Sequence, residues 1–226
     1  MGTFMARLTP TSRKDLLGLA RGNLVRAGTI LIRQGDQRRH VDLLRSGSRT
    51  QSACVKVTAT ARNGNESLLG IRVGGDVIGE LAALQGTQRS ATVTTCTEAL
   101  VHSITHSDFL AFLRDHPEGW EAMCRMIAGR LEWANQRRLD FAGYDVPQRL
   151  ARILLELTAL HGVRTGAGWE LGVRLSQVEF GRLIGAKEDA ASSAMRKLRS
   201  DGLVRSAYRS VLITDLEGLK LFADAP

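Results

Sequence analysis

The chain has 226 residues, of which 43% are hydrophobic and 24% are charged, as expected for a globular protein with one large domain or two smaller ones. Its formal net charge of +8 is compatible with a polyanionic partner such as nucleic acid. The sequence has no signal-like N-terminal run and nothing near the ~18 consecutive apolar residues of a membrane span, so we expect a cytoplasmic protein without a membrane partner.

The cysteines and histidines give no sign of a disulfide framework or a metal site. The three cysteines are odd in number and widely spaced, and no CxxC pair or Cys/His cluster is present. His102 and His106 lie four residues apart, but they straddle a predicted strand end. We therefore expect no metal. Because no nucleophile–base set is recognisable either, we expect no catalytic residues and no enzyme.

The N-terminal half is predicted to be mainly β-structure. A short helix over residues 12–21, with Ser12 as its N-cap, precedes it. From residue 29 onward, short β segments alternate with turns, and Asn63-Gly64 separates two of them in the manner of a β-hairpin. Several short strands at close spacing predict a small antiparallel barrel or sandwich.

Helices follow from residue 107. Residues 107–117 read as a short helix capped by Ser107 or Asp108 and stopped by Pro117. Residues 118–144 form a long periodic segment in which six of seven positions, in steps of four and three, are apolar. A core helix within one domain would show a similar pattern, but a length of roughly 40 Å favours a helix that forms a dimer. The predicted dimer contacts are Trp120, Cys124, Ile127, Leu131, Ala134 and Phe141.

The C-terminal part begins after an interruption at residues 145–147, which we interpret as a hinge. An amphipathic helix over residues 148–162 ends at a glycine, and the alternation over residues 169–176 predicts a strand.

Residues 175–204 have the pattern helix, glycine turn, helix. Ser176 and Glu179 form a capping box, Gly185 provides the turn, and the second helix stops at Asp201-Gly202. This pattern predicts a helix-turn-helix, although a generic helical hairpin would look similar. Two further strands around residues 206–210 are expected to form a wing beside it.

Charge supports the DNA-binding interpretation of this region. Residues 174–209 contain eight Lys or Arg against four acids, and this excess suits contacts with phosphates. The predicted DNA contacts are Ser176, Gln177, Lys187, Glu188, Asp189, Ser192, Ser193, Arg196, Lys197, Arg199 and Arg209.

The stretch GELAALQGTQRSATV, residues 79–93, places Glu80 and the Arg89-Ser90 pair on either side of one short loop. An exposed Glu80–Arg89 ion pair that holds a turn is one explanation. A pocket for an anion that also carries a sugar hydroxyl is the other, because Arg offers a planar donor fork to phosphate and a carboxylate suits a hydroxyl. The second explanation is favoured by the rest of the chain.

The order of these features resembles the Crp/Fnr family of bacterial transcription regulators. The motifs LIRQGD, GGDVIGEL, RSATV, DVPQRLARILLEL and LSQVEFGRLIG carry the resemblance, which runs from about Leu16 to Thr214. It implies an α+β fold: an N-terminal antiparallel, jelly-roll-like β-roll at 1–116, a dimerisation helix and hinge at 117–145, and a winged helix-turn-helix domain at 146–226.

The resemblance also implies an effector and partners. In the cyclic-nucleotide members, the glutamate of GEL accepts a hydrogen bond from the ribose 2′-hydroxyl, and the arginine and serine of RSA bind the cyclic phosphate. The effector would be cAMP or another cyclic nucleotide, and the partners would be double-stranded DNA, a second copy of the chain and RNA polymerase. The implied ligand contacts are Gly79, Glu80, Leu81, Arg89, Ser90, Ala91 and Asn135.

Three departures from the family pattern stand out. The Thr-Ser pair that contacts adenine falls on Ala134 and Asn135, so the base contact is altered, although Asn135 still suits a purine edge. The Arg-Glu…Arg set of the recognition helix falls on Glu188, Asp189 and Ser193, which implies a different operator or weak binding through phosphates. About six residues, 48–53, look inserted as a surface loop of unknown role.

Other hypotheses remain open from the sequence alone. A nucleotide-binding module with altered or lost DNA specificity would act through protein contacts, and a constitutive DNA binder would need no ligand. Redox sensing through an iron–sulfur cluster lacks its N-terminal cysteines, whereas haem sensing is neither supported nor excluded by the histidine pattern.

Overall fold

The computed structural model describes residues 2–47, 52–207 and 210–225. The chain forms two compact units that divide between Glu132 and Trp133, within its longest helix. Among the described residues, no helix combines the length and the apolar character that spanning a membrane requires.

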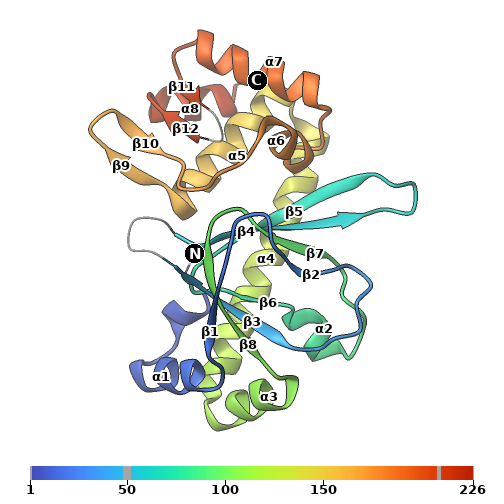
Figure 1. Cartoon of the computed structure of the whole chain (residues 1–226). Helices are drawn as coiled ribbons and strands as arrows, with labels where there is room; N and C mark the ends of the chain where they lie inside the picture. Colours follow the sequence, from blue (N-terminus) through green and yellow to red (C-terminus); the bar gives the residue numbers. More distant parts are fainter. Residues whose placement is uncertain (1, 48–51, 208–209, 226) are drawn as a thin grey trace. The chain divides into compact units, whose positions relative to one another are not determined.

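The first unit is built on two antiparallel four-stranded sheets, in the orders β1-β8-β3-β6 and β2-β7-β4-β5 (Figure 1). The predicted β-roll is therefore confirmed. Its strands are β1 Gly22–Val25, β2 Ile30–Ile32, β3 Val41–Ser46, β4 Cys54–Thr60, β5 Glu66–Val73, β6 Val77–Ile78, β7 Thr92–Thr95 and β8 Ala99–Ile104. Its helices are a 3-10 turn at Met5–Arg7, α1 Pro10–Gly18, α2 Glu80–Gln85, α3 His106–Asp115 and the first half of α4 Pro117–Gly143.

Two clusters of buried side chains hold this unit together. One lies between the sheets and draws side chains from both of them, among them Leu44, Val55, Val93 and Val101. The other joins α1, α3 and the start of α4 to β3 and β6, and its largest fully buried members include Leu16, Leu43, Phe109, Leu113 and Met123. Burial of apolar surface, at roughly 25 cal/mol per Å², is what fixes α4 against the roll.

The hairpin predicted at Asn63-Gly64 is confirmed. β4 and β5 pair in antiparallel register from Cys54 with Val73 to Thr60 with Glu66. Gly64 has a φ of +84°, a conformation that glycine adopts without steric cost.

Two predicted helix caps were wrong by a few residues. α1 begins at Pro10, and the Thr9 hydroxyl caps it by accepting from the Ser12 amide at 3.2 Å, so Ser12 lies inside the helix. α3 is capped by the Thr105 hydroxyl, which accepts from the Asp108 amide at 3.2 Å. In both places a threonine three residues upstream occupied the position, because a cap serves the N2 or N3 amide rather than its own neighbour.

The second unit combines the end of α4 with a helical domain that carries a small sheet. The interruption at residues 145–147 is a change of helix, where Asp145 forms a capping box with Gln148 at the start of α5. The sheet has the order β11-β12-β10-β9. The elements are α5 Val146–His161, β9 Val163–Thr165, β10 Gly168–Glu170, α6 Gln177–Leu183, α7 Glu188–Ser200, β11 Val204–Ala207, β12 Ser210–Ile213 and α8 Leu216–Ala223.

The strand predicted at residues 169–176 is much shorter in the structure. Only Gly168–Glu170 pairs in the sheet, although Leu171, Val173 and Leu175 are buried as their alternation suggested. Gly172 ends the extended run with a φ of +73°, and a Cβ there would collide with the His161 carbonyl oxygen. The chain turns where only glycine fits.

A buried charge network joins the end of α4 to α5 within the second unit. The Asp140 carboxylate, which is 1% exposed, accepts from Arg152 Nε at 2.9 Å and pairs with Arg137 at 2.7 Å. Arg137 also pairs with Glu156 at 2.7 Å, and burial raises the pKa of Glu156. Buried ions are tolerated only when each has its partners, so this junction depends on every member.

We therefore expect Asp140→Ala to lower the free energy of unfolding by about 3 kcal/mol, because buried Arg137 and half-buried Arg152 lose their shared carboxylate. Urea unfolding followed by circular dichroism measures the change. Glu217→Ala removes an exposed partner of Lys220 and should change stability by less than about 0.5 kcal/mol. Equal effects of the two substitutions would contradict the role of the network.

Candidate functional site

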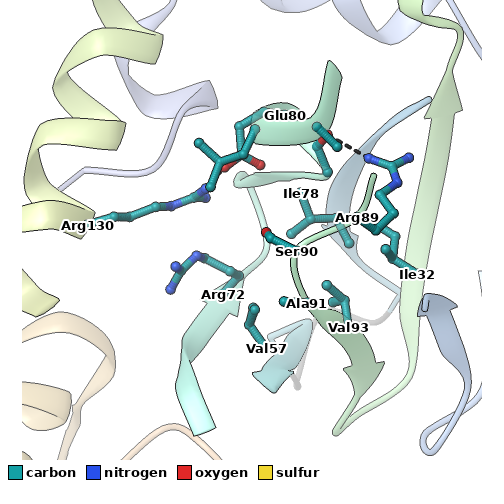
Figure 2. Close-up of a pocket in the computed structure, with 13 residues that line it drawn as sticks. Ile32, Val57, Arg72, Ile78, Glu80, Arg89, Ser90, Ala91, Val93 and Arg130 are labelled. Carbon is teal, nitrogen blue, oxygen red and sulfur yellow. Dashed lines mark hydrogen bonds and ion pairs between the residues drawn. The ribbon is translucent and has the colours of Figure 1, made fainter. Parts of the chain in front are cut away.

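The corner between β6 and α2 is shaped by one glycine. Gly79 has a φ of +80° and precedes the helix that starts at Glu80. A Cβ at this position would collide with Arg89 Nη1, so only glycine lets the arginine approach the turn. The Gly79 carbonyl oxygen accepts from Arg89 Nη1 at 2.6 Å (Figure 2).

Arg89 is a buried cation without a carboxylate partner. It is 3% exposed, and its Nη2 donates to the His40 carbonyl oxygen at 2.5 Å. Burial lowers its pKa, nearby Asp42 opposes that shift, and guanidinium remains charged at neutral pH in either case. Within the part of the chain that the structure describes, no acid lies within ion-pair distance of it, which leaves its charge available to an anion.

Glu80 does not pair with Arg89. It is 4% exposed and forms an ion pair with Arg130 of α4, whose Nη2 also donates to the Val77 carbonyl oxygen at 2.9 Å. The alternative of an exposed Glu80–Arg89 pair was therefore wrong. Arg130, which our sequence analysis missed, lies one helical turn before Ala134, and that spacing was the available signal.

These groups line one cavity of about 140 Å³ in the first unit. Figure 2 shows the Arg130 side chain extending from α4 toward Glu80, with Arg72 lower on the same side. Arg72 is the second charged lining residue that the sequence analysis missed, and the apolar residues Ile32, Val57, Ile78, Ala82 and Val93 were missed as well. The other lining residues are Ile32, Val57, Ile78, Gly79, Leu81, Ala82, Arg89, Ser90, Ala91 and Val93.

Six of the seven predicted ligand contacts thus come together at this cavity. Ser90 and Leu81 are exposed at its rim, whereas Glu80 and Arg89 are buried in its wall. Asn135 is exposed on α4 in the part that belongs to the second unit, and its predicted contact stays a prediction.

The second unit contains the predicted helix-turn-helix. The capping box at the start of α6 is confirmed, with the Ser176 amide donating to Glu179 Oε2 at 2.7 Å. Gly185 has a φ of +64° in the turn, and a Cβ there would lie 3.2 Å from the Phe141 ring. α7 buries Ala191, Ala194, Met195 and Leu198.

The opposite face of α7 is exposed and carries Asp189, Ser193 and Arg196 near its centre. Lys187, Glu188 and Arg199 are exposed at its margins. Four of the predicted DNA contacts already have side-chain partners. The Ser192 hydroxyl donates to Gln177 Oε1 at 2.5 Å, Lys197 pairs with Asp201 at 3.3 Å, and the Ser176 hydroxyl accepts from the Glu179 amide at 3.3 Å. Arg209 lies outside the described residues, as do positions 48–51 of the inserted loop.

The predicted dimer stripe on α4 is an apolar surface that the chain leaves uncovered. Trp120 is 40% exposed, Leu131 61% and Phe141 44%, and Cys124 and Ala134 are exposed as well. Ile127 is half-buried, since it also packs against the core of the first unit. The predicted contacts thus lie on the face of α4 that does not pack against the roll.

In the described ranges 2–47, 52–207 and 210–225, no group of three or more His, Cys, Asp or Glu is placed to hold a metal ion.

The fold and the two sites together define a transcription regulator that combines a cyclic nucleotide-binding domain with a DNA-binding domain. Residues 23–116 match the cyclic nucleotide-binding domain family and residues 148–222 match the Crp-like helix-turn-helix domain family. A CRP-like cAMP-activated global transcriptional regulator of Mycobacterium tuberculosis is 33% identical over 168 residues, which cover 74% of this chain and 75% of that protein.

Two solved structures share the fold. The global regulator CLP of Xanthomonas campestris, described as c-di-GMP responsive, aligns with a TM-score of 0.75 at 21% identity, covering 91% of this chain and 99% of that one. A CRP-family transcriptional regulator of Thermus thermophilus gives 0.73 at 23% identity, covering 90% and 97%. This chain belongs to the Crp/Fnr family of transcription regulators.

Arg89 also has a structural role, because its side chain donates to two backbone carbonyl oxygens. We expect Arg89→Ala to lower the free energy of unfolding by about 1–3 kcal/mol, because two part-buried carbonyl groups lose their donors. Ser90→Ala, at an exposed position, should change it by less than about 0.5 kcal/mol. Thermal unfolding of both variants measures the change in stability. If Arg89→Ala is as stable as the wild type, the hydrogen bonds to the two carbonyl groups do not stabilise the protein.

Proposed function

We propose that the chain is a homodimeric regulator that binds double-stranded DNA with an affinity set by a cyclic nucleotide in the cavity of the first unit. The observation that carries the proposal is the buried, unpaired charge of Arg89 beside Ser90 and Glu80. In this proposal the protein is not an enzyme and acts in the cytoplasm on RNA polymerase. The domains are 1–116, 117–145 and 146–226.

The cavity supplies the contacts that a cyclic nucleotide needs at its phosphate and ribose. Arg89 uses two of its N–H groups on carbonyl oxygens, and the planar guanidinium has three more for a phosphate. The Ser90 hydroxyl at the rim would donate to the same phosphate. Glu80 would accept from the ribose 2′-hydroxyl. cAMP activates the Mycobacterium tuberculosis relative according to its name, which makes a cyclic nucleotide the ligand class of the proposal.

α4 connects this cavity to the DNA-binding unit. Arg130 of α4 neutralises Glu80, and the same helix continues past the unit boundary to Asp140 and the buried network with α5. A hydroxyl that donates to Glu80 competes with Arg130 for the carboxylate oxygens. Ligand binding therefore changes how tightly α4 is held, and this is our proposed route of coupling.

The exposed face of α7 favours an operator sequence different from the one that the family pattern implies. Its first turn carries Glu188 and Asp189, and carboxylates accept from the cytosine N4 amino group rather than binding guanine. Arg196 and Arg199 are the exposed cations of α7 that form no ion pair among the described residues, so we assign the phosphate contacts to them. The wing and α6 would position the helix in the major groove.

Fluorescence anisotropy with DNA from the upstream region of its own gene tests the switch. At one fixed salt concentration, a saturating cyclic nucleotide should change the affinity of the wild type by about 5–150-fold. Arg89→Ala should remove this difference, because the phosphate loses its cation. Arg196→Ala should weaken binding equally with and without ligand, and Arg114→Ala, at an exposed arginine of α3, should leave both affinities unchanged.

An affinity that is equal with and without nucleotide would leave a constitutive DNA binder. Absence of DNA binding under both conditions would favour the alternative of a regulator that acts through protein contacts.

The dimer is tested by a matched pair of substitutions on α4. Leu131→Glu places a charge in the apolar stripe and should convert the dimer to a monomer, because burying an unpaired charge is costly. Leu139→Glu is the control, since Leu139 is 64% exposed against 61% for Leu131 and lies off the stripe. Multi-angle light scattering measures the mass, and a monomeric wild type or an unchanged Leu131→Glu mass would overturn the proposed interface.

A further inference from the structure

A third arginine, Arg72 on β5, lines the same cavity. Its one hydrogen bond among the described residues is short-range, from Nη1 to the carbonyl oxygen of its neighbour Ile71 at 2.7 Å. Gly70 makes room for it, because a Cβ there would lie 2.8 Å from Arg72 Nη1. The Arg72 guanidinium thus lies at the cavity without a hydrogen bond to another described strand or helix.

The charge of Arg72 has no compensating partner in the described part of the chain. No carboxylate lies within 4 Å of it, and Glu80, the acid in the cavity wall, is already paired with Arg130. Burial and the neighbouring charge of Arg130 lower the pKa of Arg72 to about 10, more than Asp76 and Glu80 raise it. The lining thus contains three cations, Arg72, Arg89 and Arg130, and one anion, Glu80. A ligand that compensates this charge would present acceptor groups at more than one position.

Arg72 and Arg89 act on different ends of the cavity. Arg72 lies on β5 and donates to the Ile71 carbonyl oxygen, whereas Arg89 donates to the carbonyl oxygens of Gly79 and His40. Figure 2 shows Arg72 and Arg89 on opposite sides of Ser90. A ligand whose phosphate is held at Arg89 and whose ribose is held at Glu80 would therefore direct its base toward Arg72.

We propose that Arg72 recognises the edge of the base and that the effector is a guanine cyclic nucleotide rather than an adenine one. Guanine presents O6 and N7 side by side as two acceptors, which match the planar fork of arginine. Adenine presents an amino donor in place of O6, and a guanidinium has no acceptor to offer it. The inference rests on the proposed function and adds the identity of the base.

The apolar part of the lining is compatible with this orientation. Ile32, Val57, Ile78 and Val93 line the cavity together with the arginines, and such side chains suit the face of a purine ring.

Isothermal titration calorimetry on the full chain tests the proposal with five probes: cGMP, cAMP, inosine 3′,5′-cyclic monophosphate, 7-deaza-cGMP and cyclic di-AMP. The wild type should bind cGMP and the inosine analogue, which keeps O6 and N7, at least about tenfold more tightly than cAMP. The 7-deaza analogue, which lacks N7, should fall between them.

Arg72→Met should bring cGMP and cAMP to within about twofold of each other, because it removes the fork and retains the length of the side chain. Arg72→Leu should also lose the preference, and it replaces Arg72→Met if thermal unfolding shows that the latter does not fold. Arg62→Met is the matched control, on the exposed turn of the same hairpin, and should keep the preference.

The outcomes separate this inference from the proposed function. If no cyclic nucleotide binds the wild type, or if Arg89→Ala binds normally, the proposed function fails. If binding depends on Arg89 but cAMP equals or exceeds cGMP, or if Arg72→Met keeps the preference, the guanine proposal alone is overturned. Tighter, Arg72-dependent binding of cyclic di-AMP would assign Arg72 to a second phosphate and would also overturn it.

Discussion

A buried guanidinium beneath a left-handed glycine turn is the constraint on which the ligand site depends. Arg89 can reach the Gly79 carbonyl only because residue 79 has no Cβ, and α2 begins directly after this turn with Glu80 in the wall of the cavity. The arginine is held by carbonyl oxygens rather than by a carboxylate. It is therefore fixed in place while its charge stays uncompensated, which is the preorganisation that an anion site needs.

α4 has to satisfy several requirements along one helix. Ala122 and Met123 are packed in the core of the first unit, while Leu131 on another face is exposed. Arg130 supplies the counter-charge to Glu80, and Asp140 anchors the helix to α5 through buried ion pairs. Since all of these contacts lie on one helix, α4 is where we propose that ligand and DNA binding are coupled.

The charged residues around Asp140 and those that line the cavity have different roles. The network around Asp140 is internally paired, with Arg137 and Arg152 facing the carboxylate, and it contributes to the stability of the junction. The cavity in the first unit has an excess of cations, with Arg72 and Arg89 unpaired by any described acid. Uncompensated positive charge of this kind lowers the stability of the free protein. A ligand that provides acceptor groups would restore the lost stability.

The sequence by itself determined the features that depend on neighbouring residues. The Asn63-Gly64 hairpin, the Ser176–Glu179 capping box and the glycine motif at residue 79 are local, because turn geometry and capping involve residues within a few positions of one another. Where two possible capping residues lie within three positions of each other, as at the start of α1 and of α3, the local pattern was ambiguous and the prediction was wrong.

Only the tertiary structure decided which side chains share the cavity. Glu80 is paired with Arg130, fifty residues away, rather than with Arg89 nine residues away, and Arg72 enters the lining from another strand. No periodicity or motif encodes such pairs, because they follow from how the sheets and α4 pack together. In the folded chain, Arg72 and Arg89 lie at the cavity without a carboxylate partner among the described residues. This property arises only when the chain folds.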